Sequence, residues 1–510
     1  MKNLLPPSKI IHYPLSIIHY FHYLCTKIVN DMVDIKKLYE LYQQHPCITT
    51  DSRDCPVGSI FLALKGETFD GNKFALQALE KGCAYAIVDD KDLFTTTKTT
   101  KTTLGDSLSP EEKELSKLSE LSSKIILVED CLQTFKDLAR EHRRQFDIPV
   151  IGITGTNGKT TTKELIAAVL SQKYNVLYTQ GNFNNDVGVP KTLFRLTKEH
   201  EIAVIEMGAS HPGDIKTLAE TAEPTCGLIT NVGRAHLLGF GSFEGVIKTK
   251  CELYDFLRSR KDSLIFINAD NEHLMSQIGD DEEIWMSPYS TDPDNWYSCI
   301  SGEVIECNPF LKFRWREPLM VLEEEGRSTK WHKVQTQLIG SYNIDNLLAA
   351  IAVGINFGVD RKKICAALEE YVPSNNRSQM TVTAKNHLIV DAYNANPTSM
   401  HAALDNFSQI NLPLTSDHSP LKKMAIIGQM GELGNESDKE HRLLVDRLAS
   451  SGYDDVWLVG DNFRDIPCPF RKFHDVEEVK AAITADCPEG FYILIKGSNS
   501  NKLFQLPELL

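Results

Sequence analysis

The chain has 510 residues, which at about 150 residues per domain predicts about three domains. Apolar residues make up 42% of the sequence and charged residues 24%, so a wholly disordered chain, a collagen-like fibre and a membrane bundle are excluded. The net charge of −15 argues against a general nucleic-acid-binding protein, because phosphate contacts need an excess of lysine and arginine on some face. The twelve cysteines form no CxxC pair, which favours a reducing cytoplasm.

Two segments differ in composition from the rest of the chain. Residues 10–25 are largely apolar, but histidines and Pro14 interrupt any run long enough to cross a membrane, and no small-residue cleavage site follows. We therefore interpret residues 1–31 as a dispensable extension before an ordinary domain that starts at Met32. Residues 94–124 are rich in threonine, serine and lysine, and we interpret them as an exposed insertion within that domain.

The remaining sequence repeats one pattern, in which a short apolar run is followed at once by a polar or glycine-rich turn. Continuous apolar runs are typical of strands that are buried on both faces of a parallel sheet. We predict an α/β fold with a smaller α/β domain over 32–147, a central parallel-sheet domain over 148–372 and a Rossmann-like domain over 373–510. Pro149 and the turn at Pro373 mark the boundaries.

Polar residues directly follow several of these predicted strands, namely Glu206, Asn231, Asp391 and Lys496. Ligands of open parallel sheets bind beyond the carboxyl ends of the strands. We therefore expect the functional site at these positions.

The strongest motif runs from Gly152 to Thr161, between a predicted strand and a predicted helix. Glycines there allow backbone N–H groups to approach phosphate oxygens, Lys159 can reach the terminal phosphates, and Thr160 can bind Mg²⁺. Ile153 stands where the strict GxxxxGK[ST] pattern requires its first glycine, and a glycine turn that binds no phosphate is the alternative. The predicted nucleotide-binding residues of this central P-loop ATPase domain are Gly155, Thr156, Asn157, Gly158, Lys159, Thr160 and Thr161.

Three residues are candidates for a metal site. The Glu206 carboxylate could bind a Mg²⁺ that bridges nucleotide phosphates, or could be a structural cap. His236 could complete the site, or could be an ordinary loop histidine. Lys250 shares an otherwise apolar face of a predicted helix over 242–257, so its ammonium must reach solvent, find a partner or lose its charge. Reaction with CO₂ would give a carbamate able to bind Mg²⁺, although physical reasoning alone favours extension of the side chain to solvent.

Further candidates lie outside the central motif. Asn346 opens an alanine-rich predicted helix and could contact a nucleotide base or cap that helix. Arg377 lies at the entrance of the third domain and Asp391 ends its first strand, where an arginine would suit the charge that develops on a transferred phosphoryl group; surface roles are the alternative. In the first domain, turns containing Ser52, Arg53 and Lys65 combine hydroxyl and basic groups that could hold a diphosphate.

Five blocks of this sequence, in order, resemble the Mur ligase family of peptidoglycan synthesis over essentially all of residues 32–510. They are GTNGKTTTKE at 155–164, GNFNNDVGVP at 181–190, IEMGAS at 205–210, NVGRAHLLGFGS at 231–242 and the region around Lys250. Two further blocks resemble the branch of the family that adds D-alanyl-D-alanine to UDP-N-acetylmuramoyl-tripeptide. These are DAYNANPTSM at 391–400 and GQMGELG at 428–434.

The resemblance implies a cytoplasmic, ATP-dependent ligase that acts on these two small molecules and binds neither nucleic acid nor membrane; we expect a monomer. It implies that Lys159 binds phosphates and that Lys250 is carbamylated, which reverses the preference from physical reasoning. It also assigns Thr160, Glu206, His236 and Lys250 to Mg²⁺, and Asn346, Arg377 and Asp391 to ATP. Substrate-binding residues on this basis are Ser52, Arg53 and Lys65 at the UDP end, and Asn394, Asn396, Lys496 and Ser498 near the dipeptide.

Two departures from the family pattern lie in the third domain. Val390 stands where the family has an aspartate, and Asn499 replaces the arginine that usually follows the KGS block. The second change leaves open how the dipeptide carboxylate would be bound.

Two other functions are compatible with a nucleotide loop. Folylpolyglutamate synthases share the loop, but that family lacks a UDP-binding first domain of this kind. A protein that binds nucleotide only to switch partners would leave the Lys250 and Asp391 regions unexplained. The sequence does not decide between diaminopimelate and lysine as the third residue of the tripeptide.

Overall fold

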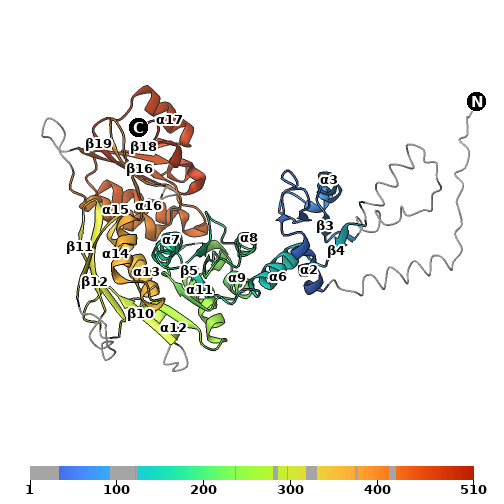
Figure 1. Ribbon diagram of the computed structural model, residues 1–510. Helices are drawn as coiled ribbons and strands as arrows, with labels where there is room; N and C mark the ends of the chain where they lie inside the picture. Colours follow the sequence, from blue (N-terminus) through green and yellow to red (C-terminus); the bar gives the residue numbers. More distant parts are fainter. Residues whose placement is uncertain are drawn as a thin grey trace, which may run out of the picture. The chain divides into compact units, whose positions relative to one another are not determined.

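Figure 1 shows the computed structural model of the chain, which describes residues 34–91, 121, 123–235, 237–278, 285–295, 297–317, 330–373, 377–412 and 421–510. The predicted extension 1–31 and most of the predicted insertion 94–124 lie outside the described residues. The chain divides into two compact units, Met1–His142 and Arg143–Leu510, and each unit is described by itself. Within the described ranges, no helix combines the length and the apolar character that a membrane span requires.

The first unit contains a four-stranded parallel sheet in the order β1-β2-β3-β4. β3 and β4 pair directly, so the segment between them connects neighbouring strands of one sheet. The strands are β1 (Ile48–Thr49), β2 (Ile60–Leu62), β3 (Tyr85–Val88) and β4 (Ile125–Leu127). The helices are α2 (Ile35–Gln44), α3 (Ala75–Glu80) and α6 (Cys131–Arg143).

The second unit begins with a nine-stranded sheet in the order β13-β12-β11-β10-β9-β8-β5-β7-β6. Strands β5 to β11 are parallel to one another, whereas β12 and β13 are antiparallel to their neighbours. The strands are β5 (Val150–Thr154), β6 (Val176–Tyr178), β7 (Ile202–Glu206), β8 (Cys226–Ile229), β9 (Leu264–Asn268), β10 (Trp285–Ser290), β11 (Ile300–Cys307), β12 (Phe310–Arg316) and β13 (His332–Ile339).

Helices cover both faces of this sheet. Ile151 and Ile153 of β5 point into a core shared with α7, α13 and α14, whereas the intervening Gly152 faces Leu253 of α11. β5, β7 and β8 are buried at every position, which is the reason for their uninterrupted apolar sequences. The helices are α7 (Lys159–Leu170), α8 (Gly188–Leu193), α9 (Asp214–Ala222), α10 (Leu237–Phe240), α11 (Phe243–Arg258), α12 (Glu272–Ile278), α13 (Ile344–Asn356) and α14 (Arg361–Glu370).

A six-stranded sheet, in the order β14-β15-β19-β16-β17-β18, completes the second unit. All its pairs are parallel except that of the edge strand β14 with β15. The elements are β14 (Gln379–Val382), β15 (His387–Asp391), α15 (Pro397–Gln409), β16 (Lys422–Gly428), α16 (Ser437–Ala449), β17 (Asp455–Val459), β18 (Arg471–Phe473), α17 (Val476–Ala485) and β19 (Phe491–Lys496). The predicted α/β class with mostly parallel sheets is confirmed. The boundary at 372/373 falls between α14 and β14 and stays a prediction.

Candidate active site

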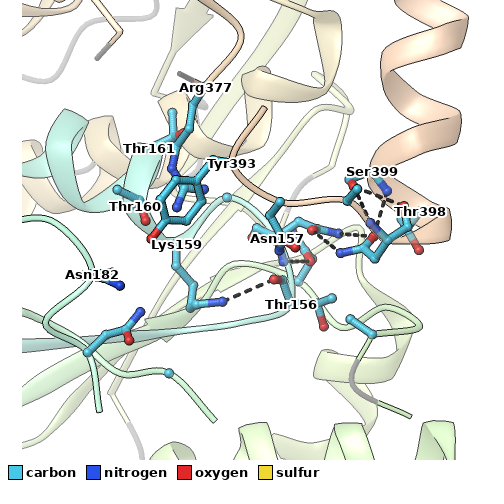
Figure 2. A pocket seen from close by; sticks show the side chains of 18 of the residues that line it. Thr156, Asn157, Lys159, Thr160, Thr161, Asn182, Arg377, Tyr393, Thr398 and Ser399 are labelled. Carbon is cyan, nitrogen blue, oxygen red and sulfur yellow. Dashed lines mark hydrogen bonds between the residues drawn. The ribbon is translucent and has the colours of Figure 1, made fainter. Parts of the chain in front are cut away.

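The second unit contains a pocket of about 1030 Å³ where the carboxyl ends of β5, β7 and β8 face residues that follow β15 and β19 (Figure 2). Most of the predicted site residues line it together. They are Thr156, Asn157, Gly158, Lys159, Thr160, Thr161, Glu206, Asn231, Asn346, Arg377, Asp391, Asn394, Asn396, Lys496 and Ser498. Gly155 and Lys250 do not line the pocket, and His236 lies outside the described residues.

The loop between β5 and α7 has the backbone of a phosphate-binding loop. Gly158 adopts a φ of +80°, and a Cβ atom there would lie 2.5 Å from Asn346 Oδ1, so only glycine fits. The Lys159 ammonium donates hydrogen bonds to the carbonyls of Gly155 at 2.8 Å and Thr156 at 3.2 Å. The pKa of Lys159 is lowered, chiefly because the ammonium is enclosed; the Glu206 carboxylate opposes this shift and the Arg377 guanidinium reinforces it.

The Glu206 carboxylate ends β7 at the floor of the pocket and is 1% exposed. Its Oε1 accepts hydrogen bonds from Thr160 Oγ1 at 3.1 Å and from Asn184 Nδ2 at 2.9 Å. Its Oε2 has no hydrogen-bond partner among the described residues. A buried carboxylate beside a hydroxyl at the phosphate loop offers oxygen ligands of the kind that Mg²⁺ prefers.

Lys250 lies on α11 and is only 2% exposed, so the expected extension of its side chain to solvent is wrong. Its ammonium donates to the Ala209 carbonyl at 3.4 Å and lies 5.3 Å from the centre of the Phe240 ring. Burial lowers the pKa of Lys250 to about 7, and the nearby Lys159 charge contributes to the shift.

Asn157 connects the phosphate loop to the C-terminal sheet. Its backbone N–H donates to Asn231 Oδ1 at 3.0 Å, and its carbonyl accepts from Asn231 Nδ2 at 3.0 Å and Thr230 Oγ1 at 2.6 Å. Its side-chain Oδ1 accepts from Asn396 Nδ2 at 2.8 Å. Asn396 also caps α15, because its Oδ1 accepts from the Ser399 N–H at 2.9 Å. The predicted substrate residue Asn396 therefore has two structural contacts.

Arg377 and Tyr393 stack at the edge of the pocket, with the guanidinium carbon 3.9 Å from the ring centre (Figure 2). Within the described part of the chain, Arg377 Nε has no hydrogen-bond partner. Lys496 and Asp391 are neighbours in register on β19 and β15 and form an ion pair of 2.6 Å. The Arg377 guanidinium therefore lies near the phosphate loop, where its charge acts on Lys159. The Asp391 carboxylate is paired with Lys496.

Asn346 is the third residue of α13 and does not cap it, because the N-cap is Asn343. Its Nδ2 donates to Asn343 Oδ1 at 2.9 Å, and its Oδ1 accepts from Thr162 Oγ1 at 3.0 Å. Ser498 Oγ lies 2.7 Å from Ser500 Oγ, while the N–H of Asn499 donates to the Tyr393 carbonyl at 2.9 Å. The exposed Asn499 side chain offers no positive charge for a carboxylate.

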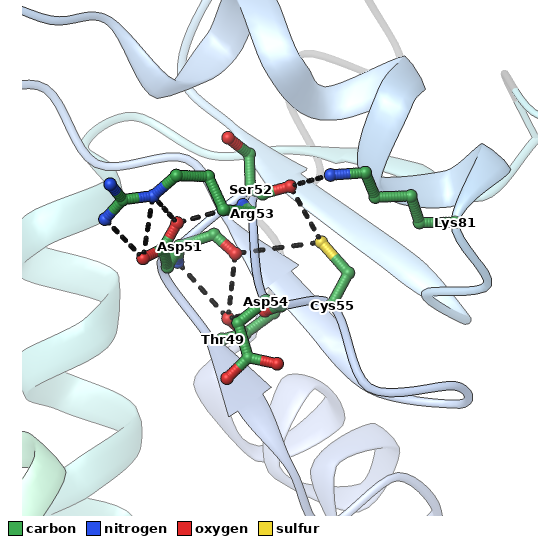
Figure 3. Close-up of polar contacts among 7 residues, drawn as sticks. All are labelled: Thr49, Asp51, Ser52, Arg53, Asp54, Cys55 and Lys81. Carbon is green, nitrogen blue, oxygen red and sulfur yellow. Dashed lines mark hydrogen bonds and ion pairs between the residues drawn. The ribbon is translucent and has the colours of Figure 1, made fainter.

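The first unit holds the remaining predicted residues Ser52, Arg53 and Lys65, of which Figure 3 shows Ser52 and Arg53. Arg53 pairs with Asp51 at 2.7 Å and is largely exposed, while Lys81 Nζ donates to the Ser52 carbonyl at 2.6 Å. Lys65 pairs with Asp89 at 2.8 Å. Both basic side chains are thus paired with carboxylates, and their assignment to a diphosphate stays a prediction.

Two residues of the site lie in sequence blocks that were recognised, but they were not singled out as site residues. Asn184 contacts Glu206 from the loop after β6, and Tyr393 stacks on Arg377. The signals for them were the two family blocks at 181–190 and 391–400 and their many asparagines, and neither signal shows which residue a given side chain contacts.

Comparisons with known proteins cover the chain in three consecutive parts. The model of the Mur ligase family catalytic domain matches residues 46–143, that of the Mur ligase middle domain matches 153–354, and that of the Mur ligase glutamate ligase domain matches 376–499. A relative from Synechocystis sp., named UDP-N-acetylmuramoyl-tripeptide–D-alanyl-D-alanine ligase, is 33% identical over 463 residues, which cover 89% of each chain. The chain belongs to the Mur ligase family.

Other relatives agree with this assignment. An Escherichia coli protein of the same name is 34% identical to this Mur ligase over 418 residues, or 81% of each chain. A crystal structure of MurF from Acinetobacter baumannii superposes with a TM-score of 0.73 and 27% identity, covering 91% of this Mur ligase and 96% of that chain. A Thermotoga maritima MurF solved with ADP has a TM-score of 0.72 at 24% identity and supports the fold. The predicted family is confirmed.

Proposed function

We propose that this Mur ligase uses ATP to join the amine of D-alanyl-D-alanine to the terminal carboxylate of UDP-N-acetylmuramoyl-tripeptide in peptidoglycan precursor synthesis. The observation that carries this function is that relatives with this printed name are 33% and 34% identical over most of the chain. The names of these relatives confirm the predicted ligase activity. The pocket is consistent with it, because a phosphate loop faces polar groups from a second sheet.

The chemistry requires activation, because a carboxylate is a poor electrophile. We propose that a tripeptide carboxylate oxygen attacks the γ-phosphorus of ATP, which releases ADP and forms an acyl phosphate. The dipeptide amine then attacks the acyl carbon, phosphate leaves, and the amine gives up a proton as the amide forms. Lys159 and Arg377 would neutralise the charge on the transferred phosphoryl group, and the pocket would hold the reacting atoms together.

Mg²⁺ fits the residues at the end of β7. Thr160 and Glu206 would hold the ion, because Thr160 Oγ1 lies 3.1 Å from Glu206 Oε1 at the phosphate loop and Glu206 Oε2 accepts no hydrogen bond from the described residues. The described residues contain no cluster of three acidic, histidine or cysteine side chains, and a Mg²⁺ site of few protein ligands is completed by phosphates and water. When bound, the ion would neutralise phosphate charge. The prediction that His236 takes part stays open to experiment.

We also propose that Lys250 is carbamylated. Carbamylation joins a neutral amine to CO₂ and releases one proton, so it requires an uncharged lysine. Burial and the lowered pKa of about 7 make the neutral amine available near neutral pH. The positive charge of Lys159 lowers the pKa of Lys250. A carbamate on Lys250 would instead be negatively charged and would attract Lys159.

The remaining assignments follow the same function. Ser52, Arg53 and Lys65 would bind the UDP end of the first substrate, and Asn394, Lys496 and Ser498 would lie near the dipeptide. We propose that the enzyme works in the cytoplasm as a monomer, without nucleic acid or membrane as a partner.

Phosphate release tests this function. The purified chain is incubated with Mg-ATP and UDP-N-acetylmuramoyl-tripeptide, with and without D-alanyl-D-alanine, and product masses are measured. Two tripeptide substrates are compared, one with diaminopimelate and one with lysine as the third residue. With at least one of them, we expect phosphate release that depends on the dipeptide and yields the pentapeptide product. Turnover only with folate and glutamate, or nucleotide binding without any amide product, would overturn the proposal.

A further inference from the structure

Lys163 is a buried lysine behind the pocket that the mechanism above does not use. It lies on α7 one turn after Lys159, is 0% exposed and is not among the residues that line the pocket. Among the described residues, its ammonium has no hydrogen-bond acceptor. An ammonium buried without hydrogen bonds is costly, so a role of its charge is needed to explain it.

The nearest charges to Lys163 are two carboxylates. Its Nζ lies 3.6 Å from Glu206 Oε2 and 3.8 Å from Glu164 Oε1. Glu164 is itself held, because its Oε2 accepts a hydrogen bond of 2.6 Å from the Tyr371 hydroxyl. Lys163 thus approaches the one oxygen of Glu206 that Thr160 and Asn184 leave unoccupied.

The charge of Glu206 also acts on a second ammonium, that of Lys159. Lys159 feels the Glu206 carboxylate electrostatically, yet its hydrogen bonds go to the carbonyls of Gly155 and Thr156. A direct Lys159–Glu206 pair would remove both groups from ligand binding, since the lysine is needed for phosphates and the carboxylate for a cation. The structure avoids this pair.

We propose that Lys163 is a positioning residue: it is the counter-ion of Glu206, and it keeps that carboxylate from pairing with Lys159 in the nucleotide-free enzyme. With Lys163 in place, Oε2 stays beside Lys163 and Oε1 stays with Thr160 and Asn184. Without it, the buried carboxylate would turn to Lys159, the other ammonium on which its charge acts, and would compete with the nucleotide phosphates.

Binding of metal-free ADP to the full chain, measured by titration calorimetry, tests this role. It rests on the nucleotide-binding part of the proposed function, which binding by the unmodified enzyme checks separately. We expect Lys163→Met to weaken ADP binding about tenfold, because Lys159 becomes engaged by Glu206. The matched control is Lys173→Met, which makes the same substitution at an exposed lysine just after α7 and should leave binding unchanged.

A second substitution distinguishes positioning from a merely structural role. Glu206→Gln removes the carboxylate that Lys163 restrains, so the double variant Lys163→Met/Glu206→Gln should bind metal-free ADP within about twofold of Glu206→Gln alone. A structural defect would instead weaken binding to a similar degree in both backgrounds, and that result would overturn the proposal. Unchanged binding by Lys163→Met would overturn it as well. If Lys163→Met does not fold, Lys163→Gln replaces it in the same cycle, with melting temperatures recorded for every variant.

Discussion

At the scale of single residues, the positive charge of the pocket comes partly from lysines whose ammonium groups are held by short-range contacts. Lys159 is folded back onto the carbonyls of its own loop, whereas Lys496 is paired with Asp391. A phosphate oxygen that enters the loop would replace the two carbonyl acceptors of Lys159 with a charged acceptor, which is a stronger partner for an ammonium. We therefore expect that removal of the positive charge of Lys159 affects phosphoryl transfer most directly.

We predict that Lys159→Met lowers phosphate release with the complete substrate set about 100-fold, because one cation that stabilises the developing phosphoryl charge is lost. The measurement is phosphate release at saturating substrates. Lys173→Met is again the matched control and should retain full activity. Activity of Lys159→Met within a few-fold of the unmodified enzyme would show that this loop does not hold the reacting phosphate.

His441 on α16 predicts a pH effect on stability. It is 0% exposed; its Nε2 accepts from the Met430 N–H at 3.0 Å, and its Nδ1 donates to the Ser437 carbonyl at 2.7 Å. Burial lowers its pKa, so below its usual pKa the unfolded chain binds a proton that the native state does not. This contribution to stability is present at neutral pH and is lost as the pH falls, by at most about 1.4 kcal/mol per pH unit for one proton.

The variant His441→Gln keeps an acceptor for Met430 but cannot titrate. We therefore expect its free energy of unfolding, measured with urea between pH 7 and pH 5, to decrease less steeply than that of the unmodified enzyme. Equal slopes would mean that His441 is not the group responsible.

The residues that could be predicted from the sequence are those whose function follows from neighbours along the chain. Lys159 and Thr160 belong to one loop, and Glu206 ends an apolar run, so local pattern was sufficient for them. The approach of Lys163 to Glu206 and the stacking of Arg377 on Tyr393 join residues that are distant or uninformative in sequence. Such contacts depend on how the helices and sheets pack, which no local pattern specifies.

At the scale of elements, helix α15 combines a structural cap with a contact to the phosphate loop. Asn396 accepts from the Ser399 N–H, and the Asn396 N–H donates to Ser399 Oγ at 3.1 Å, which forms a capping box ahead of Pro397. The same asparagine donates to Asn157 Oδ1. The start of α15 thereby fixes one side of the loop.

Two substitutions separate these roles of Asn396. Serine is a good N-cap but is too short to reach Asn157, whereas alanine can do neither. We predict that Asn396→Ala lowers the free energy of unfolding by about 1 kcal/mol more than Asn396→Ser does, as measured with urea. Both variants should bind ADP more weakly than the unmodified enzyme, and to a similar extent. Normal ADP binding by Asn396→Ser would show that the contact with Asn157 does not support the loop.

Most of the strands that the sequence predicted are parallel strands that are largely buried. Their apolar runs coincide with β5, β7, β8, β9, β15, β16, β17 and β19. The parallel strand β11 and the antiparallel strands β12 and β13 were not predicted. Leu311, Phe313 and Trp315 of β12 are buried while the residues between them are partly exposed, so the strand alternates and has no continuous apolar run.

At the scale of the whole molecule, the chain distributes its candidate ligand sites over two compact units with separate sheets. The phosphate loop and its pocket belong to Arg143–Leu510, and the turns around Ser52, Arg53 and Lys65 belong to Met1–His142. A reaction that joins two substrates with the help of a nucleotide can use such a division, because each unit can bind one ligand before the reacting groups meet.

Hydrogen exchange measured by mass spectrometry can assign each ligand to its unit. We predict that Mg-ADP slows exchange in peptides covering 155–161, because the loop N–H groups become bonded to phosphate. UDP-N-acetylmuramoyl-tripeptide should slow exchange in peptides covering 48–66, and Arg53→Met should remove much of this protection. The matched control Arg144→Met breaks an ion pair of 2.6 Å with Glu223 in the second unit and should leave the protection intact. Protection by the tripeptide substrate confined to residues 143–510 would contradict the assignment of Ser52, Arg53 and Lys65 to the UDP end.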